Sequence, residues 1–314
     1  MKSMHRRSFL AQSALGAAGW LLPEYAWSYG EGLEKKKRPA HTLTILHTND
    51  QHSRIDPFPA GAPKHAGEGG FARRHALIRR IRQEATGPVI LLDAGDVFQG
   101  TPYFNFYGGQ LEFHLMSCMG YDACTLGNHD FDNGLEGLEK MLPHARFPFV
   151  CSNYDFSATR LKGRFPRHLI LKRGGLKVGI YGLGISPENL IPEKLFGATR
   201  FLDPLEVALA LESELAEKHH CDLVVCLSHL GYQYEKEKRL SDVTLAPQLK
   251  YTHLIIGGHT HTFLDEPLRL TGSAGNTVVV TQAGWAGLRL GRIDFQWDDK
   301  KKLLSGRFFM EKIF

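Results

Sequence analysis

Cysteine is scarce in this sequence, and its spacing excludes the usual cysteine-based frameworks. The 314 residues include five cysteines, an odd number, with no Cys-x-x-Cys pair. All five lie in or beside apolar segments, which is typical of small core residues. We therefore expect neither a disulfide framework nor a thiolate zinc site at Cys118, Cys124, Cys151, Cys221 and Cys226.

Long runs of one charge are also absent. The formal net charge is +5, and no run of five or more basic residues suggests an arm that binds nucleic acid. A basic stripe with interleaved aromatic residues is missing as well, so we expect no nucleic-acid partner. The sequence has no internal repeat or low-complexity tract, which favours one globular domain over residues 41–314. The basic residues that do gather fall on one predicted helix, where we expect a solvated face: Arg73, Arg74, Arg79, Arg80 and Arg82.

The first 28 residues have the pattern of a bacterial export signal. Arg6 and Arg7 are followed by Ser-Phe-Leu, and residues 11–22 form an uncharged, mildly apolar stretch. This pattern predicts a twin-arginine signal peptide over residues 1–28 and a linker over residues 29–40, with an amphipathic first helix as the alternative. The stretch is shorter than the ~20 residues of a transmembrane helix, and no cysteine nearby suggests a lipid anchor. We expect a periplasmic or otherwise exported protein that has no membrane anchor after cleavage.

Apolar strand-like runs alternate with segments of helical periodicity, which predicts an α/β fold. Helices are expected at residues 71–84, 110–119 and 203–219, and another from about Gly134. Three strands near the end of the chain, at residues 277–281, 289–297 and 303–313, have an antiparallel pattern. The preceding strands are predicted at residues 41–48, 88–92, 123–126, 147–151, 169–171, 178–183, 223–227 and 251–256.

Five of the predicted strands end in side chains that can bind a metal ion. One such motif alone is explained by a turn, and residues 127–132 could be a capped turn ahead of the following helix. Five in succession point instead to a site at the carboxyl edge of a sheet, where active sites of α/β proteins lie. Mixed oxygen and nitrogen ligands suit borderline divalent metals. The candidates are Asp50 and His52, Asp96, Asn128 and His129, His229, and His259 and His261.

These motifs resemble the signature blocks of the calcineurin-like metallophosphoesterases. The blocks are Asp-x-His, Gly-Asp, Gly-Asn-His-Asp, a single His and Gly-His-x-His. The longer forms at residues 46–52, 95–102 and 127–132 resemble the 5'-nucleotidase branch of that family. The resemblance implies a four-layer α/β/β/α sandwich of the metallo-dependent phosphatase type, with the metals at the carboxyl ends of the strands.

The resemblance also implies two divalent metal ions (Mn, Zn, Fe or Co) bridged by Asp96. His129 is then not a ligand: it faces the phosphate, is oriented by Asp132 and stabilises the transition state and the leaving group. Asp130 is expected to have a structural role, and Asn153, after another predicted strand, is a further candidate for substrate binding. Relatives often have Gln in place of His261. One metal site would be completed by Asp50, His52 and His261, and the other by Asn128, His229 and His259.

The implied function is hydrolysis of phosphate monoesters, above all 5'-nucleotides, by in-line attack of a metal-activated water. A thiosulfohydrolase-like activity and a 2',3'-cyclic phosphodiesterase activity on the same dimetal site are the alternatives. A non-catalytic metal-binding subunit is an alternative of another class, against which the complete ligand set and the His129–Asp132 pair argue.

The resemblance further implies a second, carboxyl-terminal domain that binds the nucleobase, whereas this sequence reaches Phe314 after the last predicted hairpin. Three explanations stay open. A separately encoded nucleotide-binding protein could supply that domain, the enzyme could be a less selective phosphomonoesterase, or its substrate could differ.

Overall fold

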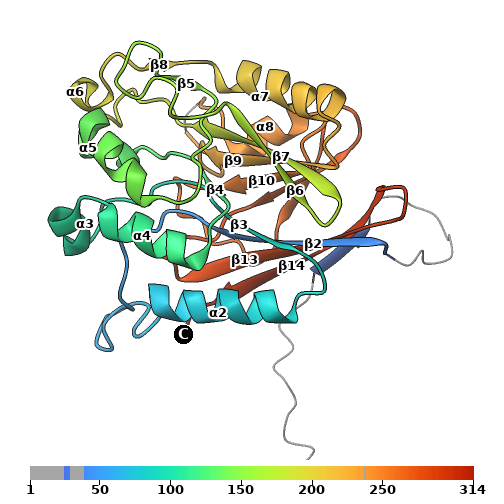
Figure 1. Cartoon of the computed structure of the whole chain (residues 1–314), viewed down its shortest axis with the longest axis horizontal. Helices are drawn as coiled ribbons and strands as arrows, with labels where there is room; N and C mark the ends of the chain where they lie inside the picture. The colour runs from blue at the N-terminus through green and yellow to red at the C-terminus, as the bar shows by residue number, and fades with distance from the viewer. Residues whose placement is uncertain (1–24, 29–38, 237) are drawn as a thin grey trace, which may run out of the picture.

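Two six-stranded sheets pack face to face in the computed structural model, which describes residues 25–28, 39–236 and 238–314 (Figure 1). The first sheet has the order β1 (Tyr25–Ser28), β14 (Leu303–Lys312), β13 (Arg289–Trp297), β2 (His41–Thr48), β3 (Val89–Asp93) and β4 (Ala123–Cys124). The second has the order β11 (Leu268–Thr271), β12 (Thr277–Thr281), β10 (Leu254–Gly257), β9 (Leu223–His229), β7 (Leu176–Gly184) and β6 (His168–Arg173). A separate small pair consists of β5 (Tyr154–Asp155) and β8 (Arg200–Phe201).

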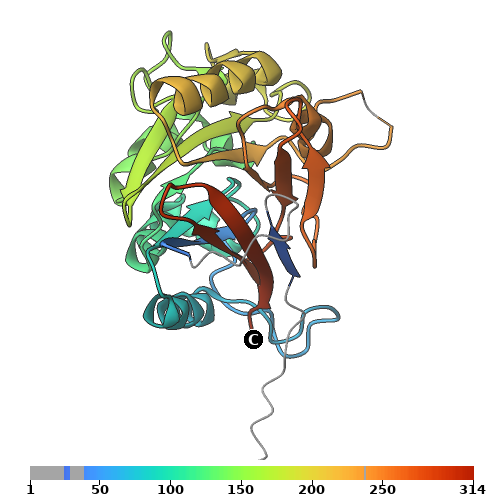
Figure 2. The same ribbon diagram turned by 90° about the vertical axis from the view of Figure 1, so that its right-hand side faces the viewer.

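Helices cover the outer face of each sheet, so the predicted four-layer α/β/β/α sandwich is confirmed (Figures 1 and 2). Helices α2 (Phe71–Glu84) and α4 (Gln110–Met119) share one apolar cluster with the first sheet. Helices α7 (Pro204–Ser213) and α8 (Asp242–Leu245) share another with the second sheet. The other α-helices of the described residues are α3 (Pro102–Tyr107), α5 (Gly134–Met141) and α6 (Glu193–Phe196).

Alternation of side chains along the strands divides the core into layers. Ile45 of β2 and Val225 of β9 belong to the cluster between the two sheets. Their sequence neighbours Leu46 and Val224 point the other way and pack under the helices. This is the period of two expected of strands that are buried on both faces.

The order of parallel strands determines where the polar strand ends meet. Strands β2, β3 and β4 are parallel neighbours in one sheet, and β7, β9, β10 and β12 are parallel neighbours in the other. Because the carboxyl ends of parallel neighbours lie at one edge, each sheet gathers its strand-end side chains there.

Three predictions of local structure are wrong. Residues 147–151 form no strand beyond a single bridge from Phe149 to Cys124, because Pro148 cannot donate a ladder hydrogen bond. Strand β12 lies in the second sheet, parallel to β10 and antiparallel to β11, and is not a neighbour of β13. The antiparallel hairpins β6–β7 and β13–β14 are confirmed.

The third wrong prediction concerns Arg74 on helix α2. This residue is 1% exposed instead of solvated, its guanidinium lies 4.2 Å from the Phe71 ring centroid, and it donates to the side chain of Gln51. Arg73, Arg79 and Arg80 are exposed, as predicted. The bounds predicted for the helix itself, residues 71–84, are confirmed.

Most of the predicted signal peptide, residues 1–24, lies outside the described residues. Its last four residues form β1, which pairs antiparallel with β14. Cleavage after residue 28 would remove that strand. Among the described residues, no helix has both the length and the apolar character to cross a membrane.

Candidate metal centre

Five of the seven predicted metal ligands stand in tight turns after their strands, whereas His229 is the last residue of β9 and Asn128 has an ordinary negative φ. Asp50, His52, Asp96, His259 and His261 all have positive φ, between 48° and 73°. Residues other than glycine rarely adopt this left-handed conformation, and when they do they concentrate at functional sites. The turns direct five side chains from two sheets toward one point.

The first group of ligands, here called the open cluster, consists of Asp50, His52 and His261. The Nε2 atoms of His52 and His261 lie 2.9 Å apart, and Asp50 Oδ1 lies 3.9 Å and 3.5 Å from them. Two nitrogen ligands about 2.1 Å from one ion subtend roughly 90° at this separation, so the spacing suits a shared metal. The side chain of His261 is 40% exposed and stacks on Trp285, with 5.7 Å between ring centroids and 9° between planes.

The second group, here called the closed cluster, consists of Asp96, His229 and His259. His229 is fully buried, and its Nε2 lies 3.1 Å from Asp96 Oδ2. Asn128 joins this cluster, because its Oδ1 lies 2.8 Å from Nδ1 of His259. All seven predicted metal ligands therefore belong to one of the two clusters.

Asp96 lies between the clusters. Its Oδ2 is 3.1 Å from His229 of the closed cluster and 4.0 Å from His52 of the open cluster. Its Oδ1 accepts a 2.8 Å hydrogen bond from the backbone N–H of His129, which fixes the carboxylate orientation. Gly127 allows this approach, since a Cβ there would lie 2.1 Å from Asp96 Oδ1. This position suits a bridging carboxylate.

The donor atoms fit divalent metal ions. Nε2 of His229 is buried and faces the carboxylate of Asp96, whose Oδ2 lies 3.1 Å away, and Nδ1 of the same ring lies 2.6 Å from the carbonyl oxygen of Ala94. That arrangement, with one ring nitrogen held by a carbonyl and the other turned inward, is typical of metal-binding histidines. This nitrogen, two carboxylates and further imidazoles match the ligand chemistry of Zn²⁺, Mn²⁺, Fe or Co²⁺.

The electrostatics agree with a cation site. Burial lowers the pKa of His52, and it lowers the pKa of His259 to about 4, so both rings are neutral ligands at pH 7. Burial also lowers the pKa of His229, but the carboxylates of Asp96 and Asp50 outweigh it and raise the value to about 10. Two carboxylates thus concentrate negative charge at Nε2 of His229, where a proton and a metal ion would compete.

His129 lies beside the clusters and belongs to neither. Its Nδ1 is 3.0 Å from Oδ2 of Asp132, and its ring centroid is 5.4 Å from that of His52. The hydrogen bond to Asp132 raises the pKa of His129 above its usual value. The side chain is 37% exposed, so a ligand at the clusters can reach it.

Two further residues have structural contacts. The carboxylate of Asp130 accepts hydrogen bonds from the backbone N–H groups of Gly127, Asp96, Val97 and Phe98, which joins the two metal-bearing loops. Asn153 is fully buried, and its amide is occupied by the backbone N–H and carbonyl of Gly184. The part of Asn153 in substrate binding therefore stays a prediction.

Two residues of the site are not predicted from the sequence. Trp285 supports His261 by stacking on its ring, and Asn49 donates a 2.6 Å hydrogen bond to Oδ2 of Asp50. Asn49 also bonds the backbone of Ala283 and Gly284, so it links β2 to the loop after β12. The sequence feature that could have pointed to Trp285 is its position after a strand, in a loop flanked by glycines. Metal-ligand motifs do not reveal it, because tryptophan is not a metal ligand.

Comparison with known proteins identifies the class. A model of the calcineurin-like phosphoesterase family matches residues 43–263, and the chain belongs to this family. Its relatives include 5'-nucleotidases, in agreement with the sequence blocks. The chain is 34% identical over 283 residues to the snake venom 5'-nucleotidase of Naja atra, covering 84% of this chain and 52% of that protein.

Solved structures agree on the fold. The 5'-nucleotidase precursor of Thermus thermophilus superposes with a TM-score of 0.77 at 36% identity, over 87% of this chain and 54% of that one. A sulfate thiohydrolase of Thermus thermophilus gives 0.72 at 19% identity, over 88% and 57%, which supports the fold alone. The chain spans about half the length of the nucleotidase relatives that it matches.

Proposed function

We propose that this chain hydrolyses phosphate monoesters, with 5'-nucleotides as the preferred class. The observation that carries the proposal is the carboxylate of Asp96 between two ligand clusters, with the imidazole of His129 beside them. The nucleotidase relatives support the choice of substrate class.

The open and closed clusters would each hold one divalent cation. Such a pair supplies an activated water and neutralises charge on the phosphoryl oxygens. Asp96 would contribute its carboxylate to both cations, since the N–H of His129 holds Oδ1 while Oδ2 lies 3.1 Å from His229 and 4.0 Å from His52. The chain's own residues thereby set the spacing of the two sites.

His129 supplies the proton chemistry. Asp132 holds Nδ1, which leaves Nε2 free to face a bound phosphate ester. Because the hydrogen bond to Asp132 favours the protonated ring, His129 can stabilise negative charge in the transition state and donate a proton to the leaving oxygen. Asp132 orients the ring and does not itself contact the ester.

The test is a substrate panel with the purified chain in Mn²⁺. It contains nucleoside monophosphates, p-nitrophenyl phosphate, bis(p-nitrophenyl) phosphate and a thiosulfate conjugate. We expect the fastest phosphate release from the nucleotides. No phosphate from any monoester would overturn the proposal, and turnover of only the diester or only the conjugate would favour one of the two alternatives. Equal rates on nucleotides and p-nitrophenyl phosphate would favour either a separately encoded base-binding protein or a less selective phosphomonoesterase.

Export by the twin-arginine route is part of the proposal. It rests on the sequence of residues 1–28, and the relatives include a venom enzyme and a precursor protein. Residues 1–28 fused to a folded reporter should carry it out of the cytoplasm. Replacing Arg6 and Arg7 by Lys should block export, and export of that variant at the original level would contradict the route.

A further inference from the structure

A third group of metal-binding side chains lies away from the site. His168 of β6, Glu214 and His219 offer one ligand atom each, all within 4.8 Å of one another. We call this group the peripheral cluster. It joins the edge strand of the second sheet to the segment that follows helix α7.

A π-helical turn brings two of the three residues together. Residues Glu214–Lys218 form this turn, and the N–H of His219 donates to the carbonyl of Glu214 at 3.1 Å. In an α-helix, residues five apart point in directions about 140° apart, so the two side chains would diverge. The wider turn aligns them instead, and such turns are rare and concentrate at functional sites. Nε2 of His219 comes to lie 3.6 Å from Oε1 of Glu214.

The ring nitrogens are available as ligands. Nε2 of His219 is buried and has no hydrogen-bond partner within the described part of the chain. Burial lowers the pKa of His168, which favours the neutral ring that binds metal. The side chains of Glu214 and His219 are still about one-third exposed (31% and 29%), which leaves an ion a route from solvent.

The open and closed clusters provide a comparison for the distance between the two histidine rings of the peripheral cluster. Their histidine pairs have ring centroids 4.9 Å apart (His52 and His261) and 5.4 Å apart (His229 and His259). The centroids of His168 and His219 are 5.2 Å apart, between those two values.

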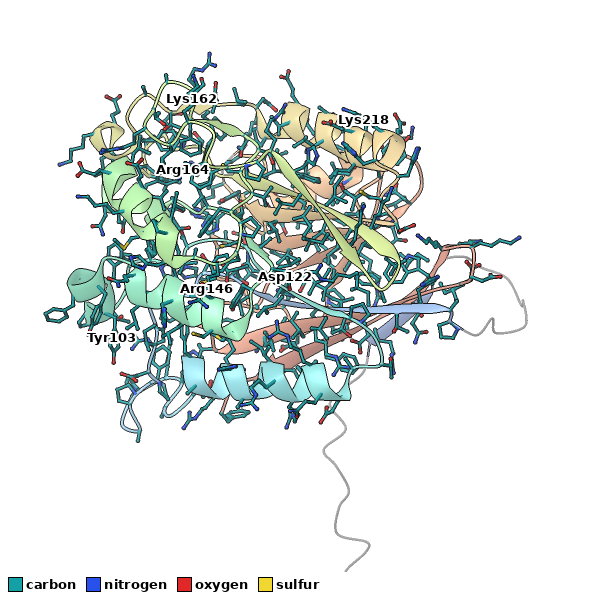
Figure 3. All side chains as sticks on the ribbon, in the orientation of Figure 1. Tyr103, Asp122, Arg146, Lys162, Arg164 and Lys218 are labelled. Atoms are coloured by element: carbon teal, nitrogen blue, oxygen red, sulfur yellow. The ribbon has the colours of Figure 1, made fainter. Side chains whose placement is uncertain are left out.

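The positive charge of Lys218 opposes the binding of a cation at the peripheral cluster. Its Nζ lies 3.1 Å from Oε1 of Glu214, but the side chain is 69% exposed and stands at the outer end of the helical segment (Figure 3). An exposed ion pair of this kind is weak, and the lysine can swing into solvent. It would therefore tune the affinity of the cluster without blocking it.

We propose that His168, Glu214 and His219 bind one Zn²⁺ ion, with water in the fourth position. Two imidazoles and one carboxylate are a common ligand set for this metal. The ion would link the edge strand β6 to the end of the outer helix layer, in a place separate from the phosphoesterase centre.

The test counts zinc in the full chain after equilibration with excess Zn²⁺ and gel filtration. The matched pair is His219→Asn and His220→Asn, because His220 is adjacent, exposed and outside the cluster. Asn suits the left-handed conformation of His220, with φ 53°. Wild type and His220→Asn should hold about one zinc equivalent more than His219→Asn.

Two more variants keep the result interpretable. His168→Gln changes the other element and should also lose one equivalent, while Lys218→Ala should keep it and bind zinc several-fold tighter by titration. Melting temperatures in chelator should show that all variants fold. Equal zinc content in wild type, His219→Asn and His168→Gln would overturn the proposal, whereas unchanged zinc affinity in Lys218→Ala would overturn only the tuning role of Lys218.

Discussion

The open and closed clusters contain similar ligands but support them differently. In the closed cluster, His229 is fully buried and the carbonyl of Ala94 holds its outer nitrogen. In the open cluster, His261 is 40% exposed and is supported by the stacked ring of Trp285. Similar donor atoms can thus give one firmly held ion and one that exchanges, because rigidity and solvent access differ.

The largest expected effect comes from removing the bridge. Asp96→Asn should release metal from both clusters, so that they no longer differ in how firmly they hold an ion. It should also lower kcat by about 10³-fold or more, because several kcal/mol of transition-state stabilisation are lost. Metal content and phosphate release measure this. Asp56→Asn, which alters an exposed carboxylate bonded to Tyr103, is the control and should keep both properties. Full metal content in Asp96→Asn would show that Asp96 bridges nothing.

The next effect separates catalysis from metal binding. His129→Ala should keep metal in both clusters and still lose roughly 10²-fold or more in kcat, the contribution of a positioned acid or base. Asp132→Asn should lose a smaller part, because the ring remains but is no longer oriented. Unchanged turnover in metal-replete His129→Ala would remove this residue from the mechanism.

Metal removal should show the contrast between the clusters directly. Dialysis of the wild type against a chelator should release one ion quickly and the second slowly. His261→Ala should accelerate only the fast release, and His229→Ala should make the slow phase fast, with a loss of affinity of about 100-fold. Stopped-flow with a colorimetric chelator follows both phases. A single phase in the wild type would mean that burial does not distinguish the clusters.

The smallest expected effect tests the support of the open cluster. Trp285→Leu removes the ring stacked on His261 and should lower the affinity of the open cluster for its ion by about tenfold or less. This is the lower end of the range expected for a residue that supports a metal ligand. The closed cluster should be unaffected. The matched control is Trp297→Phe, because Trp297 lies in the core between the sheets. Equal loss from both clusters would show a general loosening of the fold.

The α/β class and the positions of the strand-end residues can be predicted from the sequence, because both depend on local periodicity. The four-layer sandwich is implied by the resemblance to the family and does not follow from the periodicity. The neighbours of strand β12 cannot, because register between distant segments leaves no local signal. The burial of Arg74 depends on Gln51, 23 residues away, and on a ring within its own helix. The peripheral cluster is hidden in the sequence for similar reasons: it needs a π turn and the distant strand residue His168.

One carboxylate outside both ligand clusters has a wider consequence. The four N–H groups held by Asp130 belong to the loop of Asp96 and the loop of Asn128 and His129. These hydrogen bonds hold the two loops in a fixed relative position through contacts of the protein alone. Ions that bind between these two loops need little rearrangement of the protein. The selection among ions therefore depends on the size and charge that the arranged ligands accept. Asp130 thus helps to determine which ions the centre accepts, although it belongs to neither ligand cluster.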